Sequence, residues 1–177
     1  FILFFIFIFM QKKFLIKFLF FLFFFIPANS EIISGKAITI DGDTIKIKNK
    51  KIRLHGIDAP EIKQLCQRTF LSIFIFSFQE NYKCGEISKK KLEKYVKNNI
   101  IKCKVEGIDR YKRILGTCYK NTININSRMV RNGYAVAYKK YSKKYISVER
   151  EAKREELGLW KGKFDMPWDW RKNVKKK

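Results

Sequence analysis

Three short runs of alternating apolar and polar residues, separated by only a few residues, constrain the fold of this chain more than any other feature. The runs are KAITI at 36–40, TIKIK at 44–48 and IRLHGI at 52–57. A period of two with many β-branched residues is typical of strands that bury one face. The links at 41–43 (DGD) and 49–51 (NKK) have the composition of hairpin turns. We therefore expect an antiparallel meander of three strands.

The following residues change between helical and strand patterns. Residues 86–98 show an imperfect apolar stripe at helical spacing, whereas 101–106 and 113–119 return to the strand pattern. Two further helices are expected at about 125–132 and 148–157, each followed by a glycine. The predicted order is βββ-α-ββ-α-α. The predicted fold class is α+β, mainly β: a five-stranded, OB-like Greek-key barrel with three helices.

Two segments do not follow this pattern. Residues 70–78 (FLSIFIFSF) are strongly apolar and β-prone. They fit an extra strand, an exposed loop that touches a membrane, or a stretch of incorrectly translated sequence. Residues 160–177 are expected to be irregular and basic. We therefore expect one domain at 31–171, with an apolar insertion at 70–78 and a basic tail at 172–177.

Residues 1–30 differ in composition from the rest of the chain and are treated as a leader. A short basic stretch at 12–17 precedes an apolar run at 18–26, and the small residues at 28–30 (ANS) resemble a signal peptidase site. We expect a signal peptide and a secreted or periplasmic protein. The alternative is an uncleaved N-terminal membrane anchor that holds the domain outside the cytoplasm.

The chain is strongly basic, with 39 Lys and Arg against 16 Asp and Glu and a formal net charge of +23. Three of the basic residues and none of the acidic ones precede residue 31, so the remainder still carries +20. A field of this sign attracts polyanions and speeds their encounter. Nucleic acid or an anionic membrane surface is therefore the expected partner, and charge alone does not choose between them.

The four cysteines all follow the leader, at Cys66, Cys84, Cys103 and Cys118. After export they would enter an oxidising compartment, where two disulfides can form. Three pairings exist, and we favour Cys66–Cys84 with Cys103–Cys118, because the second pair would lie on two strands joined by a short connection. Zinc is the rival, but the chain has no CxxC motif and a single histidine.

Carboxylates gather at the ends of the first predicted strands. The meander can bring Asp43 and Asp58 to one edge of the sheet. A hard cation such as Ca²⁺ accepts such carboxylates together with backbone carbonyls, and Ala59 offers a carbonyl in the same turn. The alternative is that Asp41 and Asp43 only shape the turn.

Other residues suit a phosphodiester. Glu61 follows Asp58 closely and can accept a proton from an attacking water. Arg53 and Arg113 lie on two different predicted strands, where they can grip phosphate oxygens and stabilise a pentacoordinate transition state. Tyr111, Tyr138 and Tyr141 stand among basic residues and can stack on bases or hydrogen-bond to phosphate. The alternative is that these rings only pack.

Five motifs in this order and spacing resemble the staphylococcal nuclease (thermonuclease) family, from about residue 34 to 171. They are IDGDTIKI at 40–47, IRLHGIDAPE at 52–61, DRYKRILG at 109–116, MVRNGYA at 129–135 and GLWKGKFDMPWDWR at 158–171.

The resemblance implies an OB-like barrel and Ca²⁺-dependent cleavage of DNA and RNA to 3′-phosphate ends. It also assigns roles to residues already singled out. The implied metal ligands are Asp43, Asp58 and the Ala59 carbonyl, and the implied catalytic trio is Arg53, Glu61 and Arg113. Apart from the resemblance, Arg110 joins Tyr111 and Tyr138 as a candidate for substrate binding.

Three departures from the family pattern lie at or near the site. The position after Tyr111 is commonly Gly in the family and is Lys112 here, and Ala59 replaces a hydroxyl residue found in some members. The apolar insertion at 70–78 enlarges the connection after Glu61. The function expected is an exported, monomeric, Ca²⁺-dependent endonuclease with little sequence preference and no obligate protein partner. Alternatives are a non-catalytic OB-fold module that binds nucleic acid, and a cationic membrane-surface protein held by the leader and residues 70–78.

Overall fold

A computed structural model describes residues 31–74 and 76–176, and its first strands form the meander that the alternating runs predict. The strands are β1 (Ile32–Thr39), β2 (Thr44–Ile47) and β3 (Lys50–Leu54). β1 pairs with β2 and β2 pairs with β3, both antiparallel. The three strands thus form one continuous antiparallel surface.

Two later strands close this surface into a barrel. β7 (Ile100–Ile108) pairs antiparallel with β1 and with β8 (Ile114–Lys120), and β8 pairs parallel with β3. The short strand β9 (Ile123–Asn124) extends the sheet beyond β8. The predicted α+β, mainly β fold is confirmed: a closed, mixed five-stranded barrel of the OB type.

The barrel interior holds the alternate residues of these strands. Each fully buried aliphatic side chain contributes about 1.5–3 kcal/mol relative to an exposed one. Helical residues complete the same core. Its members with no exposed surface include Ile45, Ile47, Ile52, Leu54, Leu92, Ile101 and Met129.

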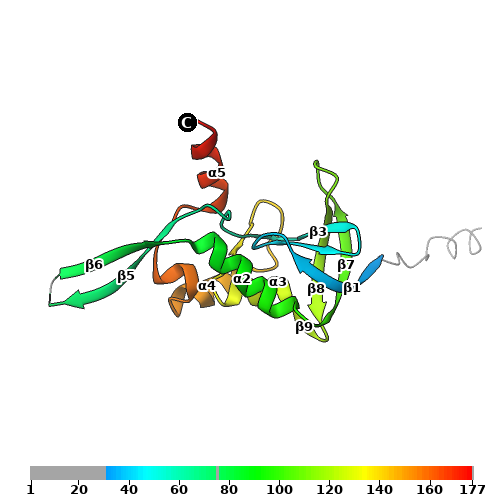
Figure 1. The fold of residues 1–177 in the computed structure, drawn as a ribbon, viewed down its shortest axis with the longest axis horizontal. Helices are drawn as coiled ribbons and strands as arrows, with labels where there is room; N and C mark the ends of the chain where they lie inside the picture. The colour runs from blue at the N-terminus through cyan, green and yellow to red at the C-terminus, as the bar shows by residue number, and fades with distance from the viewer. Residues whose placement is uncertain (1–30, 75, 177) are drawn as a thin grey trace, which may run out of the picture. The chain divides into compact units, whose positions relative to one another are not determined.

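The three predicted helices are present beside the barrel. They are α2 (Cys84–Val96), α3 (Ile125–Arg131) and α4 (Ile146–Arg154). α2 packs on β1, α3 packs on β8, and α4 packs on α3 (Figure 1). Asn124 caps α3, since its side chain accepts a hydrogen bond from the Ser127 backbone N–H.

The expectation of an irregular segment at 160–177 was wrong. The 3₁₀ turn η1 (Gly158–Lys161) leads to β11 (Gly162–Lys163) and then to α5 (Pro167–Lys175). Proline at the first helical position suits a helix start, and Trp168 stacks on Tyr138. The lysines at the end of α5 dominate the sequence pattern, but contacts with distant residues hold its first turns in place.

Both favoured disulfides are present. Cys103 and Cys118 face each other across β7 and β8, as predicted, and their Cα atoms are 4.0 Å apart. Cys66 and Cys84 join the start of β5 to the start of α2. The Cys66–Cys84 disulfide lies with Val136 and Leu159 in a separate small core.

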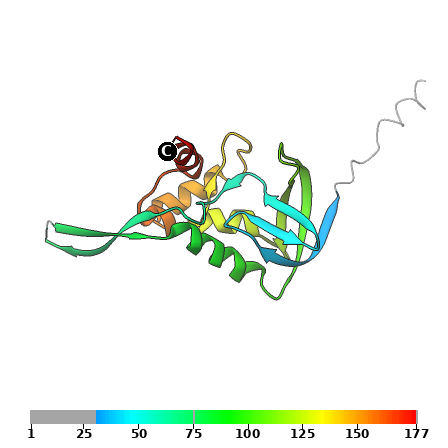
Figure 2. The ribbon, with the colours of Figure 1, turned by 45° about the horizontal axis from the view of Figure 1, so that its top comes forward.

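The apolar segment 70–78 belongs to a β-hairpin. β5 (Cys66–Ile73) pairs antiparallel with β6 (Phe76–Tyr82), and β11 pairs with β5 near its start. Figures 1 and 2 show the hairpin extending away from the barrel. Phe74, at the hairpin's turn, is fully exposed. The extra-strand interpretation is thus the one that the backbone bears out.

The predicted signal peptide or membrane anchor at 1–30 lies outside the described residues. Within 31–74 and 76–176, no helix has both the length and the apolar character needed to cross a membrane.

Candidate active site

The link between β1 and β2 places Asp43 at the start of β2. The Asp41 carboxylate accepts a hydrogen bond from the Asp43 backbone N–H at 3.0 Å, which stabilises the turn. Gly42 is required for close packing, because a Cβ there would lie 2.7 Å from the Cβ of Ala59. Burial, and then repulsion from Asp43, raise the pKa of Asp41 to about 6.

The Asp43 carboxylate is buried and accepts hydrogen bonds from two neighbours. The Ala59 backbone N–H donates to Oδ2 and the Thr44 hydroxyl donates to Oδ1, both at 3.0 Å. Asp43 therefore does more than shape the turn: it is tied to the segment that carries Asp58.

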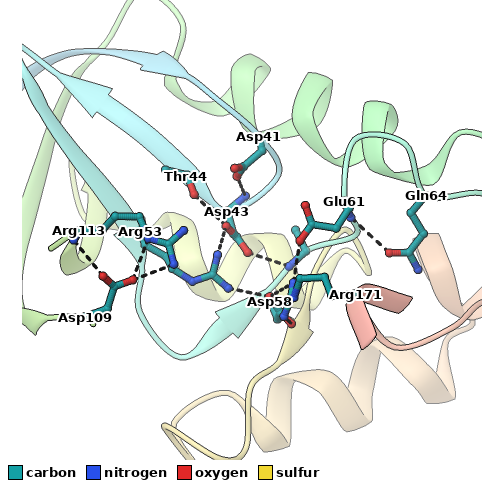
Figure 3. A network of polar contacts seen from close by, with 11 residues as sticks. Asp41, Asp43, Thr44, Arg53, Asp58, Glu61, Gln64, Asp109, Arg113 and Arg171 are labelled. Carbon is teal, nitrogen blue, oxygen red and sulfur yellow. Dashed lines mark hydrogen bonds and ion pairs between the residues drawn. The ribbon is translucent and has the colours of Figure 1, made fainter. Parts of the chain in front are cut away.

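Arg53 joins the two predicted metal-binding carboxylates. It lies on β3 opposite Thr44, and Figure 3 shows its guanidinium between Asp43 and Asp58. Nη1 is 2.5 Å from Asp43 Oδ1, and Nη2 is 2.6 Å from Asp58 Oδ1. Burial lowers the pKa of Arg53, but the charges of Asp43 and Asp58 outweigh it and the net shift is upward.

Asp58 is held by a short sheet that sequence reasoning did not anticipate. β4 (Ile57–Asp58) pairs antiparallel with β10 (Val136–Ala137), with Val136 opposite Asp58. The buried carboxylate of Glu149 accepts a hydrogen bond from the Ala137 N–H at 3.1 Å and so anchors β10 to α4. Burial raises the pKa of Asp58, and hydrogen bonds from Arg171 oppose this shift.

Arg171 is the main site residue that sequence reasoning missed. From α5, its Nη2 lies 2.7 Å from Asp58 Oδ2, and its Nη1 lies 2.8 Å from Glu61 Oε1 (Figure 3). Burial lowers the pKa of Arg171, but its hydrogen bonds with Asp58 and Glu61 and their charges outweigh this effect, and the net shift is upward. The available signal was its position at the end of the last motif, GLWKGKFDMPWDWR.

The connection between β4 and β5, residues 59–65, is here called the Glu61 loop, and it packs tightly against the first turn of α2. Gly85 lies against the Glu61 carbonyl so closely that a Cβ would overlap it. The Gln64 backbone N–H donates to the Glu61 carbonyl at 2.8 Å. The Glu61 backbone is therefore well defined, while its carboxylate remains 38% exposed.

Arg113 belongs to a neighbouring group and not to the carboxylate pair. Asp109 accepts hydrogen bonds from the Arg113 backbone N–H at 2.9 Å and from its Nε at 2.8 Å. Burial tends to raise the pKa of Asp109, but these hydrogen bonds lower it overall. Arg53 pairs with Leu115 across β3 and β8, so Arg113, two residues earlier, lies toward the same face. Figure 3 shows Arg53 and Arg113 side by side.

The loop before Arg113 carries two of the predicted substrate-binding residues. The guanidinium carbons of Arg110 and Arg113 lie 4.8 and 5.4 Å from the centroid of the Tyr111 ring, which is mostly exposed. Lys112 has a φ of 60°, a conformation that glycine adopts at less cost. Lys112 therefore has the left-handed backbone conformation that favours Gly, the residue common at this position in the family.

Tyr138, the third predicted substrate-binding residue, lies nearer to Asp58. Its ring stacks on Trp168 at 5.4 Å with an interplanar angle of 6°, and Tyr141 packs on its edge. Burial, followed by the charge of Asp58, raises the pKa of Tyr138. Tyr138 and Tyr111 therefore form two separate aromatic positions.

The donor chemistry at Asp43 and Asp58 suits a hard cation. Both carboxylates converge on a single cationic group, and their oxygens are the ligands that Ca²⁺ prefers. In the described part of the chain, no three His, Cys, Asp or Glu side chains are grouped to hold a metal ion. An ion between Asp43 and Asp58 would therefore depend on backbone carbonyls and water for its remaining ligands. Ala59, which directly follows Asp58, offers one such carbonyl.

Comparison with known proteins gives one family and several relatives. The family model described as "Staphylococcal nuclease homologue" matches residues 51–162. A micrococcal nuclease of Shigella flexneri is 29% identical over 168 residues, which cover 85% of this chain and 86% of that protein. An uncharacterized endonuclease of Haemophilus influenzae is 34% identical over 143 residues, 76% of this chain and 70% of that protein.

Plant relatives are longer. A probable staphylococcal-like nuclease of Oryza sativa, CAN3, is 32% identical over 141 residues, which cover 78% of this chain and 33% of the rice protein. The chain thus spans about a third of the length of the rice nucleases that it matches.

Proposed function

This chain belongs to the staphylococcal nuclease family, as its motifs predicted, and from that premise we propose that it is an endonuclease that hydrolyses the phosphodiester bonds of DNA and RNA with little sequence preference. One observation carries the proposal. Two buried carboxylates, Asp43 and Asp58, share the Arg53 guanidinium beside the partly exposed carboxylate of Glu61. Acids and arginines in this arrangement suit attack by water on a phosphodiester.

Glu61 acts as the general base. Its carboxylate accepts a proton from water as the oxygen attacks phosphorus. The bond from phosphorus to the 5′-oxygen then breaks, and this oxygen takes a proton from solvent water to leave a 5′-hydroxyl and a 3′-phosphate end. A positioned base of this kind contributes typically 10²–10⁴-fold to the rate. The 38% exposure of the Glu61 side chain supports this role, because water reaches it without a change of fold.

Arg53 and Arg113 stabilise the negative charge that develops on the phosphate oxygens. They come from β3 and from the residue directly before β8, and these strands pair in parallel. Planar guanidinium groups bind phosphate oxygens in a bidentate manner. Asp109 keeps the Arg113 side chain beside Arg53 before substrate binds.

We propose Ca²⁺ as the cofactor, held by Asp43, Asp58 and the Ala59 carbonyl. When bound, the ion balances the negative charge of the carboxylates and stabilises negative charge on the phosphate oxygens. The pairing of both carboxylates with one guanidinium supports this assignment, because it brings their oxygens to the same cationic group.

The proposed location is outside the cytoplasm, by export with a cleaved leader or by an N-terminal anchor. The disulfides Cys66–Cys84 and Cys103–Cys118 support this proposal, because disulfides persist in oxidising compartments. Mass mapping of the secreted protein without reduction would test both the leader and the disulfides.

Digestion of single-stranded DNA tests the activity. The purified protein is compared with Glu61→Gln and with the matched control Glu93→Gln, which makes the same change on the exposed side of α2. With Ca²⁺, the wild type and the control should cut at similar rates, and Glu61→Gln should be slower by about 10²–10⁴-fold. Wild-type protein that binds DNA but leaves it intact at every Ca²⁺ concentration would instead indicate a non-catalytic binding module.

A further inference from the structure

The C-terminal segment reaches back to the Glu61 loop at two places. The Gln64 side-chain amide donates to the Asp165 carbonyl at 2.7 Å, and Arg171 Nη1 lies 2.8 Å from Glu61 Oε1. Each contact joins residues more than a hundred positions apart in the chain. The segment that leads into α5 and α5 itself therefore both touch the same loop.

Gln64 makes the first connection from a fully buried position. Its Oε1 accepts a hydrogen bond from the Glu61 backbone N–H at 3.3 Å, while its Nε2 donates to Asp165. A buried amide with both ends satisfied is costly to disrupt. This side chain thus links the Glu61 backbone to the start of the C-terminal segment.

Arg171 makes the second connection through its planar fork. Nη2 lies 2.7 Å from Asp58 Oδ2, and Nη1 donates to both Asp58 Oδ1, at 3.2 Å, and Glu61 Oε1. The Asp58 side chain is fully buried, whereas that of Glu61 is 38% exposed. The Arg171 guanidinium therefore links the partly exposed Glu61 side chain to the buried Asp58 side chain.

Contacts other than these ion pairs determine where α5 lies. Pro167 is buried at the start of the helix, and Trp168 stacks on Tyr138. Arg171 follows one turn after Pro167, so the docking of this first turn brings its side chain to the carboxylates. Packing of this first turn therefore contributes, together with the ion pairs, to the position of the guanidinium.

We propose that Arg171 is a positioning residue of the nuclease site, which holds the Glu61 carboxylate at a fixed place relative to Asp58. The inference rests on the proposed function, in which Glu61 takes a proton from water. A free glutamate side chain samples several rotamers, and a base must lie within hydrogen-bond reach of the proton that it takes. Helix α5 is then an integral part of the site and not a tail.

Kinetics on single-stranded DNA at saturating Ca²⁺ test this role with three variants. Lys172→Ala is the matched control, because it removes the same charge from the same helix at an exposed residue that pairs with Asp169. Arg171→Ala should lower kcat by about 10–100-fold relative to this control, with a similar KM. Arg171→Lys should fall between them, since one ammonium replaces the fork.

Hydrogen exchange, measured without metal or substrate, gives a second readout. In Arg171→Ala the amides of residues 58–64 should exchange about tenfold faster than in Lys172→Ala, with β7 and β8 unchanged. Faster exchange throughout the barrel would show a general structural role and overturn the proposal.

Three kinetic results would also overturn it. The first is a kcat of Arg171→Ala equal to that of Lys172→Ala. The second is a higher kcat, which would make Arg171 a restraint on Glu61. The third is a loss of activity that lies entirely in KM, which would make Arg171 a substrate contact. If the wild type does not cut DNA, the proposed function fails, and the exchange experiment still decides whether Arg171 orders the Glu61 loop.

Discussion

Replacing Arg53 by alanine should destabilise the protein substantially in the absence of Ca²⁺. The substitution removes a guanidinium that lies 2.5 Å from Asp43 and 2.6 Å from Asp58, whose side chains are 5% and 0% exposed. Removing one partner from a buried ion pair costs about 3–5 kcal/mol, because a buried charge is left uncompensated.

The expected loss is near the lower end of this range, at about 3 kcal/mol. Asp58 keeps its two contacts with Arg171, and Asp43 keeps its hydrogen bonds from Ala59 and Thr44. Domains of this size are stable by about 5–15 kcal/mol, so the variant should still fold.

Urea unfolding followed by tryptophan fluorescence measures the change in the free energy of unfolding. Arg68→Ala is the control, because Arg68 forms an exposed ion pair with Glu80 and should cost no more than about 1 kcal/mol. If Arg53→Ala costs no more than this control, the carboxylates do not depend on Arg53 and the argument from burial is wrong.

Calcium should affect the two proteins differently. In the wild type, Arg53 competes with the ion for Asp43 and Asp58, whereas in Arg53→Ala the carboxylates are free of that competitor. A ligand stabilises the folded state in proportion to the logarithm of its concentration over Kd. Added Ca²⁺ should therefore raise the stability of Arg53→Ala more than that of the wild type. An equal effect would argue against an ion between these carboxylates.

Two further changes test the elements around the site. Asp109→Ala should cost about 1.5–3 kcal/mol at pH 7, because hydrogen bonds from Arg113 are lost. Those bonds lower the pKa of Asp109 below its ordinary value of 3.8, so wild-type stability from this group is present above that pH and is lost as the pH falls through the lowered pKa. Urea unfolding should show a smaller difference in the free energy of unfolding between the wild type and Asp109→Ala at pH 3 than at pH 7. The same difference at both pH values would exclude the carboxylate charge as the cause. Gly85→Ala should lower the free energy of unfolding by about 1–3 kcal/mol and slow DNA cleavage, because the new Cβ overlaps the Glu61 carbonyl. Urea unfolding and DNA cleavage assays check this prediction, and unchanged cleavage would mean that the loop adjusts without moving the Glu61 carboxylate.

The strands of the barrel could be predicted because their signals are local. Alternation along β1, β2 and β3 reports which face is buried, and short turn-forming links force neighbouring strands to pair antiparallel. The same reasoning placed Cys103 opposite Cys118. For these elements, the pattern that identifies each strand also identifies its neighbour.

Helix α5 could not be predicted in the same way. Its sequence ends in lysines, and the contact that docks its first turn is the stacking of Trp168 on Tyr138, a residue distant in the sequence. Such contacts stabilise a helix through tertiary packing more than through propensity, so a local pattern gives little sign of them. The pairing of β4 with β10, which holds Asp58, escaped prediction because two-residue strands have no periodicity.

The sequence by itself determined the family, the barrel and the chemical types in the site, because recurring motifs and alternation are carried by neighbouring residues. Only the tertiary structure decided which groups meet. It placed Arg53 between Asp43 and Asp58, brought Arg113 beside Arg53, and brought Arg171 to Glu61 from the far end of the chain. The physical reason is that charged side chains find their partners across the closed barrel and its docked helix, over separations that no sequence period encodes.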